Sequence, residues 1–150
     1  MSDMVILGVD YGQKRVGVAI SDSEEILATP LKVLSVRGQE DAVGQVARLA
    51  AERDVGLIVV GLPYNMDGST GAKAKETLEF VSSLRSAVGC DVMTWDERLS
   101  SFEAETALRD AGLSSRNRRA RVDKVAAQVI LSSFMESRRT RRADAADSTN

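Results

Sequence analysis

Two runs of consecutive apolar residues constrain the fold of this chain more than any other feature of its sequence. Met4–Val9 and Leu57–Val60 contain no polar residue, and several of their residues are β-branched. A strand with one exposed face alternates apolar and polar residues, so these runs indicate strands that are buried on both faces. Such strands need helices packed on both sides of their sheet, which predicts a layered α/β fold.

The other predicted elements follow in an order that defines the sheet. We expect strands at residues 4–9, 15–21, 26–36 (interrupted by Pro30), 57–60 and 90–95, and helices at about 39–53, 71–88, 100–111 and 122–138. The first three strands form an antiparallel meander, and strand–helix–strand units then add parallel strands. We therefore expect a mixed five-stranded sheet with helices on both faces, in one domain over residues 1–138. A charged tail at 139–150 lacks apolar periodicity and is expected to be disordered.

The absence of histidine excludes several kinds of catalytic site. The 150 residues include no histidine and one cysteine, Cys90, which removes serine–histidine and cysteine–histidine nucleophilic sites and zinc sites built on imidazole. Catalysis must rest on carboxylates, Lys, Arg, hydroxyl groups or bound ions. A single cysteine fits a reducing compartment, and neither a basic leader nor an apolar stretch of about 20 residues is present. We therefore expect a cytoplasmic protein without a membrane partner.

Basic residues are concentrated in the C-terminal third of the chain. Residues 116–142 contain nine Arg or Lys and two acids, a net charge of +7, whereas the whole chain carries −2. This asymmetry favours a polyanionic partner such as a nucleic acid. A solvated helix face followed by a charged tail would produce the same pattern, so charge alone leaves both interpretations open.

Two acids follow predicted strands. Asp10 ends the first buried strand, between Gly8 and Gly12, and glycines let a ligand or another backbone approach closely. Glu97 comes just after the last predicted strand, and ligands collect outside the carboxyl ends of strands in α/β sheets. Each acid has an ordinary alternative: Asp10 as the turn aspartate of a hairpin, and Glu97 as a helix-entry acid paired with Arg98.

A third acid, Asp123, lies on the apolar stripe of the last predicted helix, together with Ala127 and Ile130. An ionised carboxylate on a helix face packed against a sheet is costly without a partner. The alternative interpretations are an ion pair with Arg121 or Lys124, or an acid near a helix N-terminus that the helix dipole favours.

Three carboxylates that converge in a chain without histidine indicate a site for a hard divalent cation. Mg²⁺ and Mn²⁺ prefer oxygen ligands and keep bound waters. One such ion, or a pair roughly 4 Å apart, could activate a water and stabilise both oxygens of an in-line phosphoryl displacement. We therefore expect Mg²⁺ or Mn²⁺ as cofactor, held by the catalytic residues Asp10, Glu97 and Asp123. Because neighbouring strand residues point to opposite faces, only one of Asp96 and Glu97 can face the site, and we expect Glu97.

The loop from Gly61 to Gly71 joins a strand to a helix and is a candidate phosphate-binding segment. Its backbone N–H groups and the helix N-terminus could bind a phosphate, although the loop is not a Walker A motif. The alternative is a simple connection in which Ser69 or Thr70 caps the helix. The predicted nucleic-acid-binding residues combine this loop with basic side chains elsewhere: Lys14, Arg15, Asn65, Gly68, Ser69, Arg98, Arg119, Arg121 and Lys124.

Four blocks of residues give this sequence a resemblance to a known family. They are GVDYGQKRVGVA at 8–19, GLPYNMDGS at 61–69, DERLS at 96–100 and VDKVAAQVIL at 122–131. In this order they resemble the YqgF (RuvX-type) family of pre-16S rRNA nucleases, also called Holliday-junction-resolvase-like proteins. Ser101 stands where that family frequently has Thr.

The resemblance implies a ribonuclease H-like fold and a cytoplasmic bacterial protein. It implies a metal-dependent nuclease that hydrolyses phosphodiester bonds in 5′-end processing of pre-16S rRNA, with Asp10, Glu97 and Asp123 as the metal-binding catalytic acids. The expected partner is nucleic acid, in the form of structured RNA and also branched DNA, and the expected state is a monomer or a weak homodimer.

Three other functions stay open at this point. A resolvase that cuts four-way DNA junctions must place two active sites symmetrically and should be a stable dimer. A non-catalytic nucleic-acid-binding or ribosome-assembly module would bind with strong salt dependence and would tolerate Asp10→Asn and Asp123→Asn. A nucleotide-binding ATPase is a third reading of Asp10-Tyr11-Gly12, but the actin-like architecture needs two such domains and this chain has one.

Overall fold

The elements of the fold are defined over residues 4–22, 24, 27–65, 67–99 and 126–140, which the computed structural model describes. The strands are β1 (Ile6–Asp10), β2 (Arg15–Ser21), β3 (Ala28–Ser35), β4 (Leu57–Leu62) and β5 (Asp91–Asp96). The helices are α1 (Gln39–Glu52), α2 (Ala72–Ala87), the short 3₁₀ turn η1 (Glu97–Leu99) and a further helix at residues 126–140.

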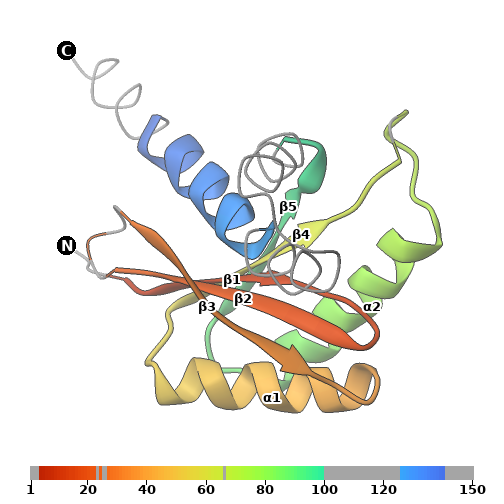
Figure 1. The fold of residues 1–150 in the computed structure, drawn as a ribbon, viewed down its shortest axis with the longest axis horizontal. Helices are drawn as coiled ribbons and strands as arrows, with labels where there is room; N and C mark the ends of the chain where they lie inside the picture. The colour runs from red at the N-terminus through yellow and green to blue at the C-terminus, as the bar shows by residue number, and fades with distance from the viewer. Residues whose placement is uncertain (1–3, 23, 25–26, 66, 100–125, 141–150) are drawn as a thin grey trace, which may run out of the picture.

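The described strands form one mixed sheet in the order β3-β2-β1-β4-β5. β2 pairs antiparallel with both β1 and β3, whereas β4 pairs parallel with both β1 and β5. The predicted antiparallel meander followed by parallel strands is therefore confirmed. Helices α1 and α2 cover one face of the sheet, and helix 126–140 covers the other (Figure 1).

The central strand β1 is buried on both faces, as its apolar run predicted. Leu7 and Val9 pack in the core beneath α1 and α2, while Ile6 packs in the core beneath helix 126–140. Alternate residues of a strand share a face, so Gly8 and Asp10 lie on the same side as Ile6. The core on that side is completed by four residues at helical spacing: Ala127, Ile130, Leu131 and Phe134.

Gly8 lets helix 126–140 approach the sheet closely. A Cβ atom at this position would lie 2.8 Å from Cβ of Leu131 and 3.0 Å from the carbonyl oxygen of Ala127. Contacts this short to a β-carbon and to a backbone oxygen leave no room for a residue larger than glycine. The helix therefore crosses directly over β1, two residues before Asp10.

Pro30 does not interrupt the third strand, contrary to the sequence prediction. β3 runs through Pro30 as an edge strand, and its pairing with β2 shifts between Val18 and Ala19, whose partners are Lys32 and Pro30. A bulge on an edge strand accommodates a residue that has no N–H to donate.

Several predicted segments lie partly or wholly outside the described residues. Helix 126–140 continues past the predicted end at residue 138. The predicted helix 100–111, the first residues of the predicted helix 122–138 and residues 141–150 of the predicted tail are outside the described ranges. Among the described helices, none combines the length and the apolar character needed to cross a bilayer.

Candidate active site

The candidate active site lies at the edge of the sheet where the parallel strands β1, β4 and β5 end. Asp10 is the last residue of β1 and is half-buried. The register pairs Val9 with Val60, so Asp10 and Gly61 are neighbours at the ends of β1 and β4. Glu97 follows β5 directly, as the first residue of η1. Two of the three predicted acids therefore reach one edge of the sheet, with β4 between them.

Gly61 makes room for the Glu97 side chain on the face that helix 126–140 covers. A Cβ atom at Gly61 would collide with Cδ1 of Ile130 on that helix, and would lie 2.9 Å from Cγ and 3.0 Å from Oε1 of Glu97. Glu97 therefore leans from the end of β5 over β4, on the same face as Asp10. Neighbouring strands are about 4.8 Å apart, so this lean spans part of the roughly 10 Å that separates β5 from β1.

Asp96 and Arg98, the residues that flank Glu97 in the chain, form an ion pair with each other. The Nε of Arg98 donates to both carboxylate oxygens of Asp96 at 3.1 and 3.0 Å, and Nη2 donates to Oδ2 at 2.6 Å. The backbone N–H of Arg98 also donates to Asp96 at 3.0 Å. Asp96 thus takes part in a local pair, and Glu97 is the acid that lies over Gly61. The alternative reading of Glu97 as the partner of Arg98 does not hold, because Arg98 pairs with Asp96.

Hydrogen bonds from Arg98 lower the pKa of the Asp96 carboxyl below its usual value, and the same pair raises the pKa of Arg98. A lowered carboxyl pKa means that the pair is complete above the ordinary aspartate value of about 3.9 and is lost only as the pH falls through the lowered value. The ion pair therefore fixes the conformation of the turn that carries Glu97 throughout the neutral pH range.

The sequence predicts that Glu97 is a catalytic acid, and on that hypothesis we expect Asp96→Asn to lower kcat by about tenfold while leaving KM within about twofold, because an error of 1 Å in a catalytic group costs up to roughly 100-fold. Single-turnover and steady-state cleavage of the same substrate would measure this. Arg98→Lys serves as the matched variant, since lysine keeps the charge but cannot form the forked pair. A rise in KM with unchanged kcat in both variants would mean that Arg98 acts through substrate phosphates and does not position Glu97.

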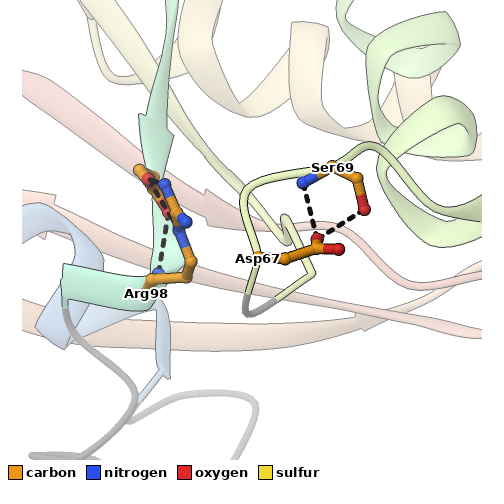
Figure 2. Close-up of polar contacts among 4 residues, drawn as sticks. Asp67, Ser69 and Arg98 are labelled. Carbon is orange, nitrogen blue, oxygen red and sulfur yellow. Dashed lines mark hydrogen bonds and ion pairs between the residues drawn. The ribbon is translucent and has the colours of Figure 1, made fainter.

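The loop between β4 and α2 is held together by its own polar groups. Asp67 Oδ1 accepts hydrogen bonds from the backbone N–H and the hydroxyl of Ser69 at 2.9 and 2.6 Å (Figure 2). These bonds, the hydroxyl one first, lower the pKa of Asp67. The amide of Asn65 donates to the Ser69 hydroxyl at 2.9 Å. The residue that caps α2 is Gly71, without a side-chain hydrogen bond, so the alternative prediction that Ser69 or Thr70 caps the helix is wrong.

Hydrogen bonds within the loop also occupy part of the predicted phosphate-binding segment. The backbone N–H groups of Asn65, Gly68 and Ser69 donate to Ser69, Asn65 and Asp67 within the loop. A phosphate at this loop would therefore be held by side chains and not by these three N–H groups. Arg98 borders the loop that carries Asp67 and Ser69 (Figure 2). Its guanidinium lies 5.4 Å from the ring centre of Tyr64, and its Nη1 lies 3.4 Å from where a Cβ of Gly68 would be.

The remaining predicted site residues fall into two groups. Lys14 and Arg15 are exposed at the turn between β1 and β2. Asp123, Arg119, Arg121 and Lys124 lie outside the described residues. Within residues 4–22, 24, 27–65, 67–99 and 126–140 no group of three or more His, Cys, Asp or Glu could hold a metal ion. A three-carboxylate site therefore needs an acid from beyond these ranges, which is where Asp123 lies.

The geometry can be compared with known proteins. A family model named RuvX, described as Holliday junction resolvase, matches residues 4–137. The chain belongs to the RuvX family. It is 42% identical over 140 residues to a Chloroflexus aurantiacus protein named "Putative pre-16S rRNA nuclease", covering 93% of this chain and 92% of that one. A relative of the same name from Anaeromyxobacter sp. is 45% identical over 135 residues, covering 90% of this chain and 98% of the relative.

Solved structures show the fold of this RuvX family member. Thermus thermophilus RuvC in complex with a Holliday junction substrate superposes with a TM-score of 0.59 at 16% identity, covering 91% of this chain and 96% of RuvC. The fowlpox virus Holliday junction resolvase superposes with a TM-score of 0.53 at 17% identity, covering 89% and 99% of the two chains. The predicted ribonuclease H-like fold is therefore confirmed.

Sequence reasoning missed three contributors to this site in the RuvX family member. Gly61 was assigned only to a phosphate loop, although it is the position over which Glu97 lies. Asp96 was treated only as a competitor of Glu97, although an aspartate commonly accepts a hydrogen bond from the backbone N–H two residues on, as Asp96 does from Arg98. Asp67 was not singled out, although an aspartate two residues before a serine is a common turn motif.

Proposed function

We propose that this chain is a divalent-metal-dependent nuclease that hydrolyses phosphodiester bonds in structured RNA, in 5′-end processing of the 16S rRNA precursor. The observation that carries the proposal is the placement of Glu97 over Gly61, on the same sheet face and at the same edge as Asp10. The names of the relatives support the substrate class.

The donor set fits a hard cation. Asp10 and Glu97 offer carboxylate oxygens, and the chain has no histidine that would favour zinc. We propose Asp123 as the third ligand: the sequence predicts a helix from residue 122 in which Asp123 shares a stripe with Ala127, and the carbonyl of Ala127 lies beside Gly8 near the end of β1. Bound Mg²⁺ or Mn²⁺ would polarise phosphate oxygens and lower the pKa of a water molecule.

The protein's own residues have separate tasks in this proposal. Asp10, Glu97 and Asp123 hold the cation and orient the scissile phosphate. The Asp96–Arg98 pair fixes the turn from which Glu97 extends. The basic and loop residues Lys14, Arg15, Asn65, Ser69, Arg98, Arg119, Arg121 and Lys124 contact the nucleic acid through their side chains, with the cationic ones neutralising phosphates. Gly68, also predicted to bind, has no side chain and its N–H donates within the loop.

Removing divalent metal is expected to abolish cleavage. Purified protein would be incubated with a 16S rRNA precursor and with four-way junction DNA, in Mg²⁺, Mn²⁺ or EDTA. Cleavage should disappear in EDTA and return when Mg²⁺ is added back in excess. Protein carrying Asp10→Asn, prepared in the same way, tests whether the cleavage depends on the proposed site. Cleavage that persists in EDTA, or in the Asp10→Asn protein, would refute the metal-dependent mechanism for whichever substrate is cut.

A Holliday junction resolvase is the second candidate, favoured by the description of the matching family model and by the similarity to RuvC in fold. Junction resolution requires two symmetric active sites, so this reading needs a stable dimer. A solution mass that stays monomeric at working concentrations, together with cleavage of the RNA but not the junction, would favour the RNA nuclease.

A further inference from the structure

A second concave surface lies at the same end of the sheet, on the side that α2 covers. It is a hollow of about 530 Å³ between the β1–β2 turn and the first turns of α2, lined by Tyr11, Gly12, Gln13, Lys14, Arg15, Ala72, Lys73, Glu76 and Thr77. Tyr11 follows Asp10 directly in the chain but packs against α2, so the hollow and the candidate active site lie at the same end of β1 on opposite faces of the sheet.

The hollow concentrates positive charge from two separate elements. Lys14 and Arg15 come from the turn, Lys73 comes from α2, and all three are exposed. The single acid among the lining residues is Glu76, so the hollow is cationic in a chain whose net charge is −2. A concave surface lined by one sign of charge concentrates ions of the opposite sign, here anions.

Contacts between the β1–β2 turn and α2 hold the walls of the hollow in place. Gln13 Nε2 donates to Oε1 of Glu76 at 3.0 Å, which ties the turn to α2. The ring of Tyr11 stacks on Phe80 of α2, with 4.3 Å between ring centres and 17° between planes.

We propose that this hollow binds the sugar–phosphate backbone of the substrate strand where that strand passes over the end of β1 from the candidate active site to the α2 side, with Lys73 completing an anion site formed with Lys14 and Arg15. The inference rests on the proposed function and extends it by a substrate subsite. Lys73 is the residue that only the fold reveals, because 58 positions separate it from Arg15 in the sequence.

The test compares two lysines of the same helix. Lys73→Gln and Lys75→Gln each remove one positive charge from an exposed position of α2, but Lys75 is not part of the hollow and faces away from Lys73. Binding of a labelled 16S precursor RNA and of junction DNA would be measured in Asp10→Asn protein across a range of KCl concentrations. Thermal melting would show that both variants fold equally well.

The expected result is a five- to tenfold weaker Kd at low salt for Lys73→Gln, with the slope of log Kd against log salt reduced by about 0.7–0.9, as for one lost phosphate contact. Lys75→Gln should change Kd by less than twofold and leave the slope unchanged. Equal effects of the two substitutions would overturn the proposal. Binding of adenosine monophosphate would be measured in the same proteins. Loss of that binding in Lys73→Gln with RNA binding intact would also overturn the proposal, since the hollow would then hold a free nucleotide.

The outcome is separable from that of the proposed function. If nucleic-acid binding is salt-sensitive and depends on Lys73 but no metal-dependent cleavage occurs, the proposed backbone-binding site stands and the proposed nuclease function is refuted. If cleavage is metal-dependent but Lys73→Gln and Lys75→Gln proteins bind nucleic acid equally well, the nuclease function stands and the proposed backbone-binding site is refuted. Absence of binding to either nucleic acid would overturn both.

Discussion

Asp10→Asn is expected to lower the rate of phosphodiester cleavage by at least about 10³-fold while the protein stays folded. A carboxylate that holds a cation contributes several kcal/mol of transition-state stabilisation, and each 1.4 kcal/mol is a factor of ten in rate. Asparagine has nearly the same shape but carries no charge. Single-turnover cleavage at saturating protein would report the chemical step and not binding.

The control for Asp10→Asn is its stability without metal. Replacing one carboxylate of a cluster removes repulsion between like charges, so the metal-free Tm should be unchanged or higher. Glu97→Gln should behave in the same way, whereas Asp96→Asn should not lose more than about tenfold in rate. Asp10→Asn protein with a normal Tm and more than about a tenth of the original rate would contradict the assigned role of Asp10.

Gly61→Ala is expected to reduce kcat by about 100-fold with a small loss of stability. The added methyl group meets Cγ and Oε1 of Glu97 at 2.9 and 3.0 Å and also meets Cδ1 of Ile130, so both side chains must move. Displacing a catalytic group by about 1 Å costs up to roughly 100-fold, while overpacking against flexible side-chain ends costs about 1 kcal/mol, near the low end of its range.

The double variant Gly61→Ala/Ile130→Val separates these two effects. Valine lacks the Cδ1 atom that the new methyl group meets, so the double variant should recover most of the lost stability, as measured by chemical denaturation. Its kcat should stay low, because Glu97 is still displaced. Recovery of activity together with stability would show that the helix, and not Glu97, causes the defect.

The sequence predicted most of the fold because the fold depends on local patterns. The continuous apolar run of β1 predicted burial on both faces, and β2 begins and ends at the residues that the sequence indicated, Arg15 and Ser21. Pro30 was misjudged because a proline can be accommodated by a bulge on an edge strand, and which strand forms the edge depends on tertiary structure.

The candidate site was only partly predictable. Asp10 and Glu97 could be singled out as candidates because Asp10 ends a strand and Glu97 follows one, positions that can be identified from local pattern. The role of Gly61 depends on a side chain 36 residues away, and the hollow beside Lys73 depends on the packing of α2 against the β1–β2 turn. Neither of these long-range contacts can be identified from a local pattern in the sequence. Asp123 stays a prediction, because it lies outside the described residues.

Mn²⁺ binding measured by electron paramagnetic resonance tests the proposed cation site most directly, since it needs no substrate. The wild-type protein should bind Mn²⁺, and Asp10→Asn, Glu97→Gln and Asp123→Asn should each weaken that binding by at least about tenfold. Asp96→Asn, which removes a carboxylate from the same turn, should leave it nearly unchanged. Equal Mn²⁺ affinity in all five proteins would contradict the claim that Asp10, Glu97 and Asp123 form one metal site.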